Sequence, residues 1–336
     1  MNRRKFNSVG LATILAHLPR LTLAETAVSQ RHGYQVAAIN NGLLTARHNG
    51  MAHSQSAVDD ETLFQVGSCS KTATALAVMT LVRDGRVDLD MPVNRYLTRW
   101  QLPGPRGAVA TIAELMSHTA GTTVHGFAGY GPTGKLPTLN DILTGRGVAN
   151  SDPILAQRRI FGRFRYSGGG TMVLQSLIED ITGTDFATYT TNEVLRPVGA
   201  SHATFAITPT RPFAYGSYEN GQAVEGGYMR HPESAAAGLW ATASDLANLF
   251  HGVLQALAGT RHAIIPMALA ERMVTPVCRK VGLGVFVSAG PTISHEGRNF
   301  GFDSIVAADL NTGQVRAAVT NRNGAIESYT EQLLAH

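Results

Sequence analysis

Cysteine and charge are scarce in this sequence, and long apolar runs are missing. Only two of the 336 residues are cysteines, Cys69 and Cys278, which is too few for the disulfide framework that holds many small secreted domains together. Their spacing along the chain does not show whether they lie within disulfide distance. A pairing therefore stays open, and we favour two buried free thiols.

Charge of either sign is limited, and the positive excess comes from one short segment. The chain carries a net charge of +4, but its first 24 residues hold Arg3, Arg4, Lys5 and Arg20 and no acid. Without this segment the net charge is zero, so nothing electrostatic favours binding to nucleic acid or to an anionic membrane. With 44% apolar and 15% charged residues, the composition is typical of a globular enzyme with a large core.

The N-terminal segment has the parts of an export signal. A basic stretch at 2–6 is followed by a modest apolar stretch at 8–18, too short to span a bilayer, and by small residues at 22–24 that suit cleavage. The order Arg-Arg-x-Phe resembles a twin-arginine signal; an ordinary Sec signal and a disordered cytoplasmic leader are the alternatives. We expect residues 1–24 to be a signal peptide and residues 25–336 to form one periplasmic or secreted domain. No later stretch reaches about 18 consecutive apolar residues, so we expect no transmembrane helix.

Patterns typical of strands lie at both ends of the chain, and helical patterns lie between them. Residues 33–51 predict a hairpin around the turn Asn40-Asn41-Gly42, and short β-rich segments after Pro276 predict an antiparallel meander. We therefore predict an α+β sandwich. The N- and C-terminal strands form one antiparallel sheet flanked by helices, and a mainly helical lobe at about 88–248 is inserted between them. The expected helices are 68–83, 111–117, 170–182 and 326–334, and the expected C-terminal strands are 281–287, 292–295, 305–309 and 315–320.

The motif Ser68-Cys69-Ser70-Lys71 is the main candidate for nucleophilic chemistry. Positions i and i+3 share a helix face, so the Lys71 amine would lie beside the Ser68 hydroxyl and, when neutral, could take its proton. At the start of a helix, free N–H groups and the helix dipole favour a developing negative charge. The Ser-x-x-Lys pattern alone is weak, because a surface lysine after a helix-capping serine produces it too. The strand-like segment before it and the long apolar helix after it favour the catalytic interpretation.

A second element, Tyr166-Ser167-Gly168, precedes another expected helix. The Tyr166 phenol could relay a proton to a leaving group. The Ser167 hydroxyl could bind substrate, and the glycines let a backbone approach closely. The alternative is a glycine-rich turn before a helix.

A third element, His295-Glu296-Gly297-Arg298, lies on a predicted edge strand. The edge of a strand beside the nucleophile could supply an oxyanion N–H and bind an extended substrate through main-chain hydrogen bonds. His295 could also hold a substrate carboxylate. The alternative is a turn with an exposed histidine.

Other catalytic and ligand motifs are incomplete, so we expect no metal site and no cofactor. Residues 129–135 fit a phosphate loop up to its lysine, but Leu136 replaces the serine or threonine that binds Mg²⁺. His295 lacks the partner histidine of a helical zinc site. His118 is expected to be a buried, hydrogen-bonded histidine rather than a ligand. The chain has no G-x-S-x-G elbow, which argues against an α/β-hydrolase.

The three elements, in this order and at this spacing, resemble the serine β-lactamase and penicillin-binding-protein family, in particular class C β-lactamases, DD-peptidases, D-aminopeptidases and related esterases. The resemblance extends over about 33–321 and includes the blocks 115–121 and 231–240. It implies that Ser68 is the acylated nucleophile and that Lys71 and Tyr166 share the proton transfer. It further implies an oxyanion hole formed by the N–H groups of Ser68 and Arg298, and a substrate site lined by Ser167, Gly168, His295, Glu296 and Gly297.

Two departures from the family pattern bear on the substrate. Gly168 stands where the second motif usually has asparagine, and His295-Glu296-Gly297 replaces the frequent Lys-Thr-Gly. A histidine is only partly cationic near neutral pH, so its hold on a β-lactam carboxylate should be weaker. Both changes argue against an efficient β-lactamase.

The expected reaction is hydrolysis through a covalent acyl-enzyme. The expected substrate is a small peptide amide that contains a D-amino acid, or an ester, and β-lactam hydrolysis should be weak. One alternative is a transacylase or cyclase, in which an amine or alcohol replaces water. Another is a penicillin-binding-like sensor that acylates without turnover.

Overall fold

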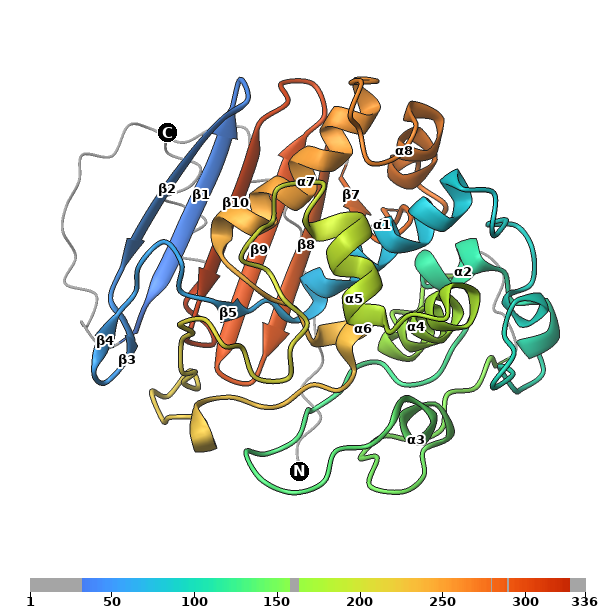
Figure 1. The fold of residues 1–336 in the computed structure, drawn as a ribbon, viewed down its shortest axis with the longest axis horizontal. Helices are drawn as coiled ribbons and strands as arrows, with labels where there is room; N and C mark the ends of the chain where they lie inside the picture. The colour runs from blue at the N-terminus through green and yellow to red at the C-terminus, as the bar shows by residue number, and fades with distance from the viewer. Residues whose placement is uncertain (1–31, 158–162, 279, 289, 327–336) are drawn as a thin grey trace.

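The computed structural model describes residues 32–157, 163–278, 280–288 and 290–326, and Figure 1 shows its ribbon. A six-stranded antiparallel sheet has the order β2-β1-β10-β9-β8-β7. Strands from both ends of the described chain therefore share one sheet, and the predicted α+β class is confirmed. The strands are β1 (Tyr34–Asn40), β2 (Leu43–Asn49), β7 (Phe286–Val287), β8 (Thr292–Asn299), β9 (Phe302–Asp309) and β10 (Val315–Thr320).

The predicted first hairpin is present as β1 and β2. Its turn residues Asn41 and Gly42 both have positive φ, at 51° and 78°, as a two-residue type I′ turn requires. Along β1 half-buried and buried residues alternate, so Ala37 and Ile39 enter the core. On its other side β1 pairs with β10, where Tyr34 is opposite Thr320.

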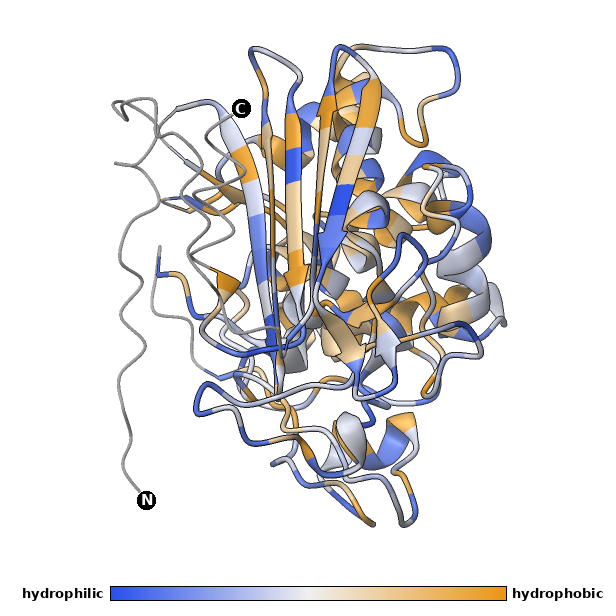
Figure 2. Ribbon diagram, turned by 90° about the vertical axis from the view of Figure 1, so that its left-hand side faces the viewer, coloured by the Kyte–Doolittle hydropathy of each residue, from blue (hydrophilic) through white to orange (hydrophobic). Residues whose placement is uncertain are grey.

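Helices fill the chain between the strands; α7 (Ala243–Leu257) lies across one face of the sheet, and α2, α3 and α4 lie beside its β7 and β8 end (Figure 1). α7 crosses β1, β10 and β9 on that face. Figure 2 shows apolar residues along the sheet strands and on the helices next to them, so the core lies between these two layers. The helices are α1 (Ser70–Arg83), α2 (Ile112–Met116), α3 (Leu139–Thr144), α4 (Gly168–Thr182), α5 (Phe186–Thr190), α6 (Ser234–Ala237), α7 (Ala243–Leu257) and α8 (Met267–Val274), and two short strand pairs are β3 (Met51–His53) with β4 (Ser56–Ala57) and β5 (Phe64–Gln65) with β6 (Trp240–Ala241).

The central helix α1 is buried on all sides from Ser70 to Leu81, as expected of a helix enclosed by other elements. Its polar side chains are satisfied inside the fold. The Thr72 hydroxyl donates to the Gly284 carbonyl at 2.9 Å, and the Thr74 hydroxyl donates to the Ala235 carbonyl at 2.9 Å. These bonds fix the N-terminal half of α1 against the segments that surround the candidate site.

The C-terminal strands are present, but two expectations about their lengths are wrong. Residues 281–287 form a strand only at β7, because Gly282 and Gly284 turn the chain back against α8 and α1. A side chain on Gly282 would overlap the Met273 carbonyl, and Gly284 has a φ of +76°. β8 and β9 are longer than expected and meet at a tight turn with Gly301 at φ +85°.

The helix expected at 326–334 lies almost wholly outside the described residues, as does the expected signal peptide. Within the ranges given above, every helix is too short or too polar to cross a bilayer.

Candidate active site

Ser68 lies in a tight turn between β5 and α1. Residues Gly67–Cys69 form a 3-10 turn, and the α-helix begins only at Ser70. Gly67 has a φ of +47°, in the left-handed region that glycine adopts without strain. The expectation that the helix begins at Ser68 is therefore corrected by two residues. Ser68 is only half-buried, so a substrate can reach this turn.

Lys71 lies beside Ser68, as the Ser-x-x-Lys spacing predicts. Its Nζ is 3.1 Å from the Ser68 Oγ and donates to the Ala236 carbonyl oxygen at 2.6 Å. The lysine is 5% exposed, and its Nζ lies 5.0 Å from the centre of the Tyr166 ring. A buried amine that is held by a carbonyl and directed at a serine hydroxyl has the geometry that a general base needs.

The two other residues of the motif stabilise the turn. The Ser70 hydroxyl donates to the Gly67 carbonyl at 2.6 Å and accepts the Leu239 N–H at 3.0 Å. The Cys69 sulfur lies 3.3 Å from the Ser304 hydroxyl, and burial raises the pKa of its thiol to about 12. Of the hydroxyl and thiol groups in this motif, only that of Ser68 lies at an accessible position.

Cys69 and Cys278 do not form a disulfide with each other, as expected. Cys69 is buried, whereas Cys278 is only half-buried, so the expectation of two buried thiols is wrong for Cys278. Its segment follows α8 near the surface rather than in the core.

Strand β8 runs directly beside the nucleophile turn. A Cβ atom built on Gly67 would lie 2.7 Å from the backbone nitrogen of Arg298, and one on Gly297 would overlap the Val66 carbonyl oxygen. The Arg298 guanidinium is bound to the Asp303 carboxylate at 2.6 and 2.9 Å. Arg298 therefore offers its backbone, not its side chain, to the turn. The assignment of its N–H to an oxyanion hole stays a prediction.

The edge of β8 is free next to this turn. β7 pairs with β8 only at Ile293 and Ser294. In the described part of the chain, no strand covers the edge of β8 from His295 onward. Such an edge can bind an extended substrate by main-chain hydrogen bonds.

Gly297→Ala is expected to lower kcat/KM for a p-nitrophenyl ester by about 100-fold, the usual effect of losing one oxyanion donor. The added Cβ would collide with the Val66 carbonyl and move β8 away from Ser68. Steady-state ester hydrolysis and thermal melting would measure the effect. Gly290→Ala is the control, because a Cβ there meets nothing within 4 Å. A wild-type kcat/KM for Gly297→Ala would contradict the close packing of β8 against the turn.

Tyr166 belongs to a group of aromatic rings on one side of the site. Its ring centre is 4.4 Å from that of His118 and 6.5 Å from that of Phe286, with 11° between the Tyr166 and Phe286 planes. Phe164 and His125 also contact it, at 6.4 and 5.1 Å. Among the described residues, the Tyr166 hydroxyl has no hydrogen bond to the nucleophile or to its lysine. Its ring face meets the amine, and its part in proton transfer stays a prediction.

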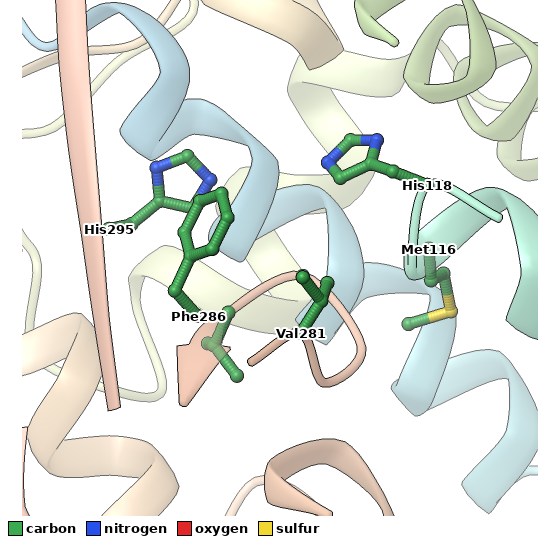
Figure 3. Close-up of a pocket in the computed structure, with 7 residues that line it drawn as sticks. Met116, His118, Val281, Phe286 and His295 are labelled. Carbon is green, nitrogen blue, oxygen red and sulfur yellow. The ribbon is translucent and has the colours of Figure 1, made fainter. Parts of the chain in front are cut away.

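Two neutral histidines line a narrow pocket behind these rings (Figure 3). Burial, together with the charge of Lys71, lowers the pKa of His118 well below its usual value and that of His295 to about 3. Apolar side chains, including Met116, Val281 and Phe286, form much of the remaining wall. The pocket therefore carries no charge at neutral pH.

The profile of the Beta-lactamase family matches residues 21–335 of this sequence. The chain belongs to the β-lactamase family.

Relatives and solved structures agree with this membership. PbpX of Bacillus subtilis (strain 168) is 25% identical over 177 residues, which are 50% of this chain and 40% of PbpX, so the match spans less than half of that protein. The fold is similar to that of a D-amino acid amidase from Ochrobactrum anthropi SV3, with a TM-score of 0.73, 19% identity, and 90% and 91% of the two chains covered. It is also similar to an octameric penicillin-binding protein homologue from Pyrococcus abyssi, with a TM-score of 0.71, 23% identity, and 90% and 73% covered. The fold is that of β-lactamases and transpeptidases, and family membership supports hydrolase activity.

In this β-lactamase-family chain, Ser167 does not present its hydroxyl to a substrate, so that expectation is corrected. The residue is fully buried, and its hydroxyl donates to the Thr123 carbonyl at 2.7 Å and accepts the Gly170 N–H at 2.9 Å. It is the N-cap of α4, which satisfies a free donor of the first helical turn. For the same reason α4 begins at Gly168, two residues before its expected start.

Gly168 lies where the family pattern usually has asparagine, and the space for that side chain is occupied. A Cβ on Gly168 would lie 3.1 Å from the Phe127 ring and 3.3 Å from the His125 carbonyl. An asparagine at this position would require Phe127 to move. The Phe127 ring therefore lies in the space that an asparagine side chain would need. A substrate contact of Gly168 itself stays a prediction.

His295 and Glu296 point to opposite faces of β8, because side chains alternate along a strand. His295 is buried toward the site, whereas Glu296 is exposed on the other face. The Glu296 side chain therefore points away from the site, and a substrate contact of Glu296 through its main chain stays a prediction. Its carbonyl has a role instead, since it accepts from the His295 Nδ1 at 2.7 Å. His295 is neutral, so it cannot hold a carboxylate by charge.

Sequence reasoning did not identify three contributors to this site. The Ala236 carbonyl binds Lys71, and the rings of Phe164 and Phe286 pack around Tyr166. A main-chain acceptor has no side-chain signal, although Ala236 lies in the family block 231–240.

His118 is buried and accepts the Ser167 N–H at 3.3 Å, as expected of a hydrogen-bonded histidine. Among the described residues, no three His, Cys, Asp or Glu side chains are placed to hold a metal ion.

Proposed function

We propose that this protein is a serine hydrolase that forms a covalent acyl-enzyme on Ser68. The observation that supports this most directly is the 3.1 Å distance between the Lys71 Nζ and the Ser68 Oγ, in a turn that a substrate can reach. Burial and the Ala236 carbonyl hold the amine in this position. The free edge of β8 beside the turn would align the substrate.

In the proposed reaction Lys71 accepts the proton of Ser68 while the Ser68 oxygen attacks the substrate carbonyl carbon. The N–H groups of Ser68 and Arg298 stabilise the oxyanion of the tetrahedral intermediate. The carbon–nitrogen or carbon–oxygen bond then breaks, and the leaving amine or alcohol receives the proton through Lys71 and Tyr166. Water attacks the resulting ester, which releases the acid and restores the Ser68 hydroxyl.

The proposed substrates are small peptide amides that contain a D-amino acid, or esters. The D-amino acid amidase with a similar fold supports this class. A neutral His295 and the Phe127 ring beside Gly168 disfavour tight binding of a β-lactam, which carries a carboxylate and an acyl-amide group.

We also propose that residues 1–24 direct export and that 25–336 act as one periplasmic or secreted domain. N-terminal sequencing of the exported protein would test this proposal.

We expect turnover of a p-nitrophenyl ester or of D-alanyl p-nitroanilide, with nitrocefin hydrolysed at least about 100-fold less efficiently, a difference of roughly 3 kcal/mol in the transition state. Steady-state assays of the three substrates, with L-alanyl p-nitroanilide as the stereochemical control, would measure this. Product analysis with added amines would reveal acyl transfer. Stoichiometric acylation without turnover would indicate a sensor, and fast nitrocefin hydrolysis would contradict the proposed substrate class.

A further inference from the structure

His231 and Glu233 form a buried pair that the proposed reaction does not use. Their side chains are 2% and 0% exposed, and the His231 Nδ1 lies 3.8 Å from the Glu233 Oε2, beyond hydrogen-bond distance. None of the four polar atoms of the two side chains has a hydrogen-bond partner in the described part of the chain. A charged pair without hydrogen bonds would be costly in such a place.

The surroundings of the pair offer no counter-charge to Glu233. A Cβ on Gly129 would lie 2.7 Å from the His231 ring, so this loop closes over the pair. The loop is bound to the neighbouring chain by two main-chain hydrogen bonds between Tyr130 and Arg230, at 2.8 and 2.7 Å. The Arg230 guanidinium donates to loop carbonyls, including that of Gly131 at 2.7 Å.

Helices α4 and α1, packed on the other sides, present one neutral and one charged group, and the loop adds a phenol. On α4, Gln175 accepts the Ala235 N–H at 3.1 Å. On α1, the charge of Lys71 is close enough to lower the pKa of His231. On the loop, burial raises the pKa of the Tyr130 phenol, and a negative charge on Glu233 would raise it as well. Of the two cations near the pair, Arg230 is bound to loop carbonyls and Lys71 acts on the histidine, so neither is hydrogen-bonded to the Glu233 carboxyl group.

Glu233 is connected to the proposed base through the short helix α6. Its carbonyl accepts the N–H groups of Ala236 and Ala237 at 3.1 and 3.0 Å, so it starts the helix. The carbonyl of Ala236 in turn binds the Lys71 Nζ at 2.6 Å. A displacement of Glu233 therefore moves the acceptor that holds the Lys71 amine.

We propose that Glu233 is a positioning residue, held as a neutral carboxylic acid beside a neutral His231, and that its ionisation displaces α6 from Lys71. This rests on the proposed function in so far as Lys71 is the base. Burial supports the neutral states, because it raises the pKa of Glu233 to about 7 and, together with Lys71, lowers that of His231 to about 4.

The two groups limit the stable pH range from opposite sides. The folded-state pKa of Glu233 is above its ordinary value of 4.5, so its contribution to stability is complete below pH 4.5 and is lost as pH rises to about 7. The folded-state pKa of His231 is below its ordinary value of 6.5, so stability is lost as pH falls from 6.5 to about 4. Ionisation of Glu233 would also remove activity on the alkaline side.

The test is Glu233→Gln in the full-length protein, with Glu225→Gln as the control, because Glu225 is exposed on a neighbouring turn. Melting temperature and kcat/KM for a p-nitrophenyl ester are measured from pH 5 to 9. Glu233→Gln should match the wild type at pH 5 and melt about 5 °C higher at pH 8. The wild type should lose about ten-fold in kcat/KM between pH 6 and 8 through this group, and Glu233→Gln should retain it, since an amide cannot ionise.

Two outcomes would overturn the proposal. A lower melting temperature of Glu233→Gln at every pH would show that the wild type holds a buried ion pair. An unchanged alkaline loss of kcat/KM would show that Glu233 does not act on Lys71. If the variant does not fold, NMR of ¹³C-labelled glutamate in the wild type is the test: one carboxyl group should be protonated at pH 6 and ionised at pH 9, and the absence of a protonated carboxyl group at pH 6 would overturn the proposal. Failure of Ser68 to react with a fluorophosphonate would contradict the proposed function but leave the melting and NMR results as the test of the neutral acid.

Discussion

Ser68→Ala is expected to abolish covalent labelling by a fluorophosphonate and to lower ester turnover by at least about 10⁴-fold, as removal of a nucleophile does in other serine hydrolases. The physical reason is that the other hydroxyl and the thiol of the motif are not placed to replace it. Ser70 and Cys69 are fully buried and bound to the protein around them, and the pKa of the Cys69 thiol is raised to about 12. Intact-mass spectrometry followed by peptide mapping measures the adduct and its position.

Ser70→Ala is the matched control for this experiment, because it removes the other hydroxyl of the same motif. It should still be labelled at Ser68, although loss of the bonds to the Gly67 carbonyl and the Leu239 N–H should lower the melting temperature. An adduct that persists in Ser68→Ala at the wild-type rate would rule out Ser68 as the nucleophile.

Lys71→Met is expected to lower the rate of acylation by about 10³-fold, within the range for loss of a general base. Methionine has a similar length and no charge, so it fits the buried position between α1 and α6. It leaves the Ala236 carbonyl without its donor, which should cost about 1–3 kcal/mol of folding stability. Stopped-flow acylation with an activated ester and thermal melting separate the two effects.

Lys135→Met, at an exposed position far along the chain, is the control for a general loss of positive charge and should acylate at the wild-type rate. If Lys71→Met also acylates normally while its stability falls, the lysine has only a structural role, and a different base must activate Ser68.

The pairing of Ser68 with Lys71 was predictable from the sequence because it is local. Because the two residues are three positions apart in helical chain, the distance between Ser68 and Lys71 does not depend on the rest of the fold. The sheet order was predictable in outline for a related reason: strand patterns at both chain ends need partners, and β1 and β10 provide them for each other. The position of Tyr166 depends on the fold between α1 and α4, and only the family resemblance indicated it.

The errors concern the directions of side chains. The Ser167 hydroxyl can cap α4 only if that helix begins at Gly168. The three glycines at 168–170 do not define the first helical residue, and the expected start was two residues too late. The exposure of Glu296 could have been deduced, since a residue next to an inward-facing His295 in a strand must face outward. The Ala236 carbonyl and the Phe286 ring gave no signal, because their contacts arise from long-range packing.

The sheet order also governs when the protein can fold. β10, the last strand of the described chain, lies between β1 and β9, and the Thr320 hydroxyl bonds to the Gly33 carbonyl across 287 positions of sequence. A two-stranded hairpin is marginally stable alone, so β1 and β2 have no lasting partner until synthesis has passed residue 320. Closure of so long a loop makes folding slow. The hairpin edge is therefore exposed to aggregation until β10 has been synthesised, and the sheet can close only then.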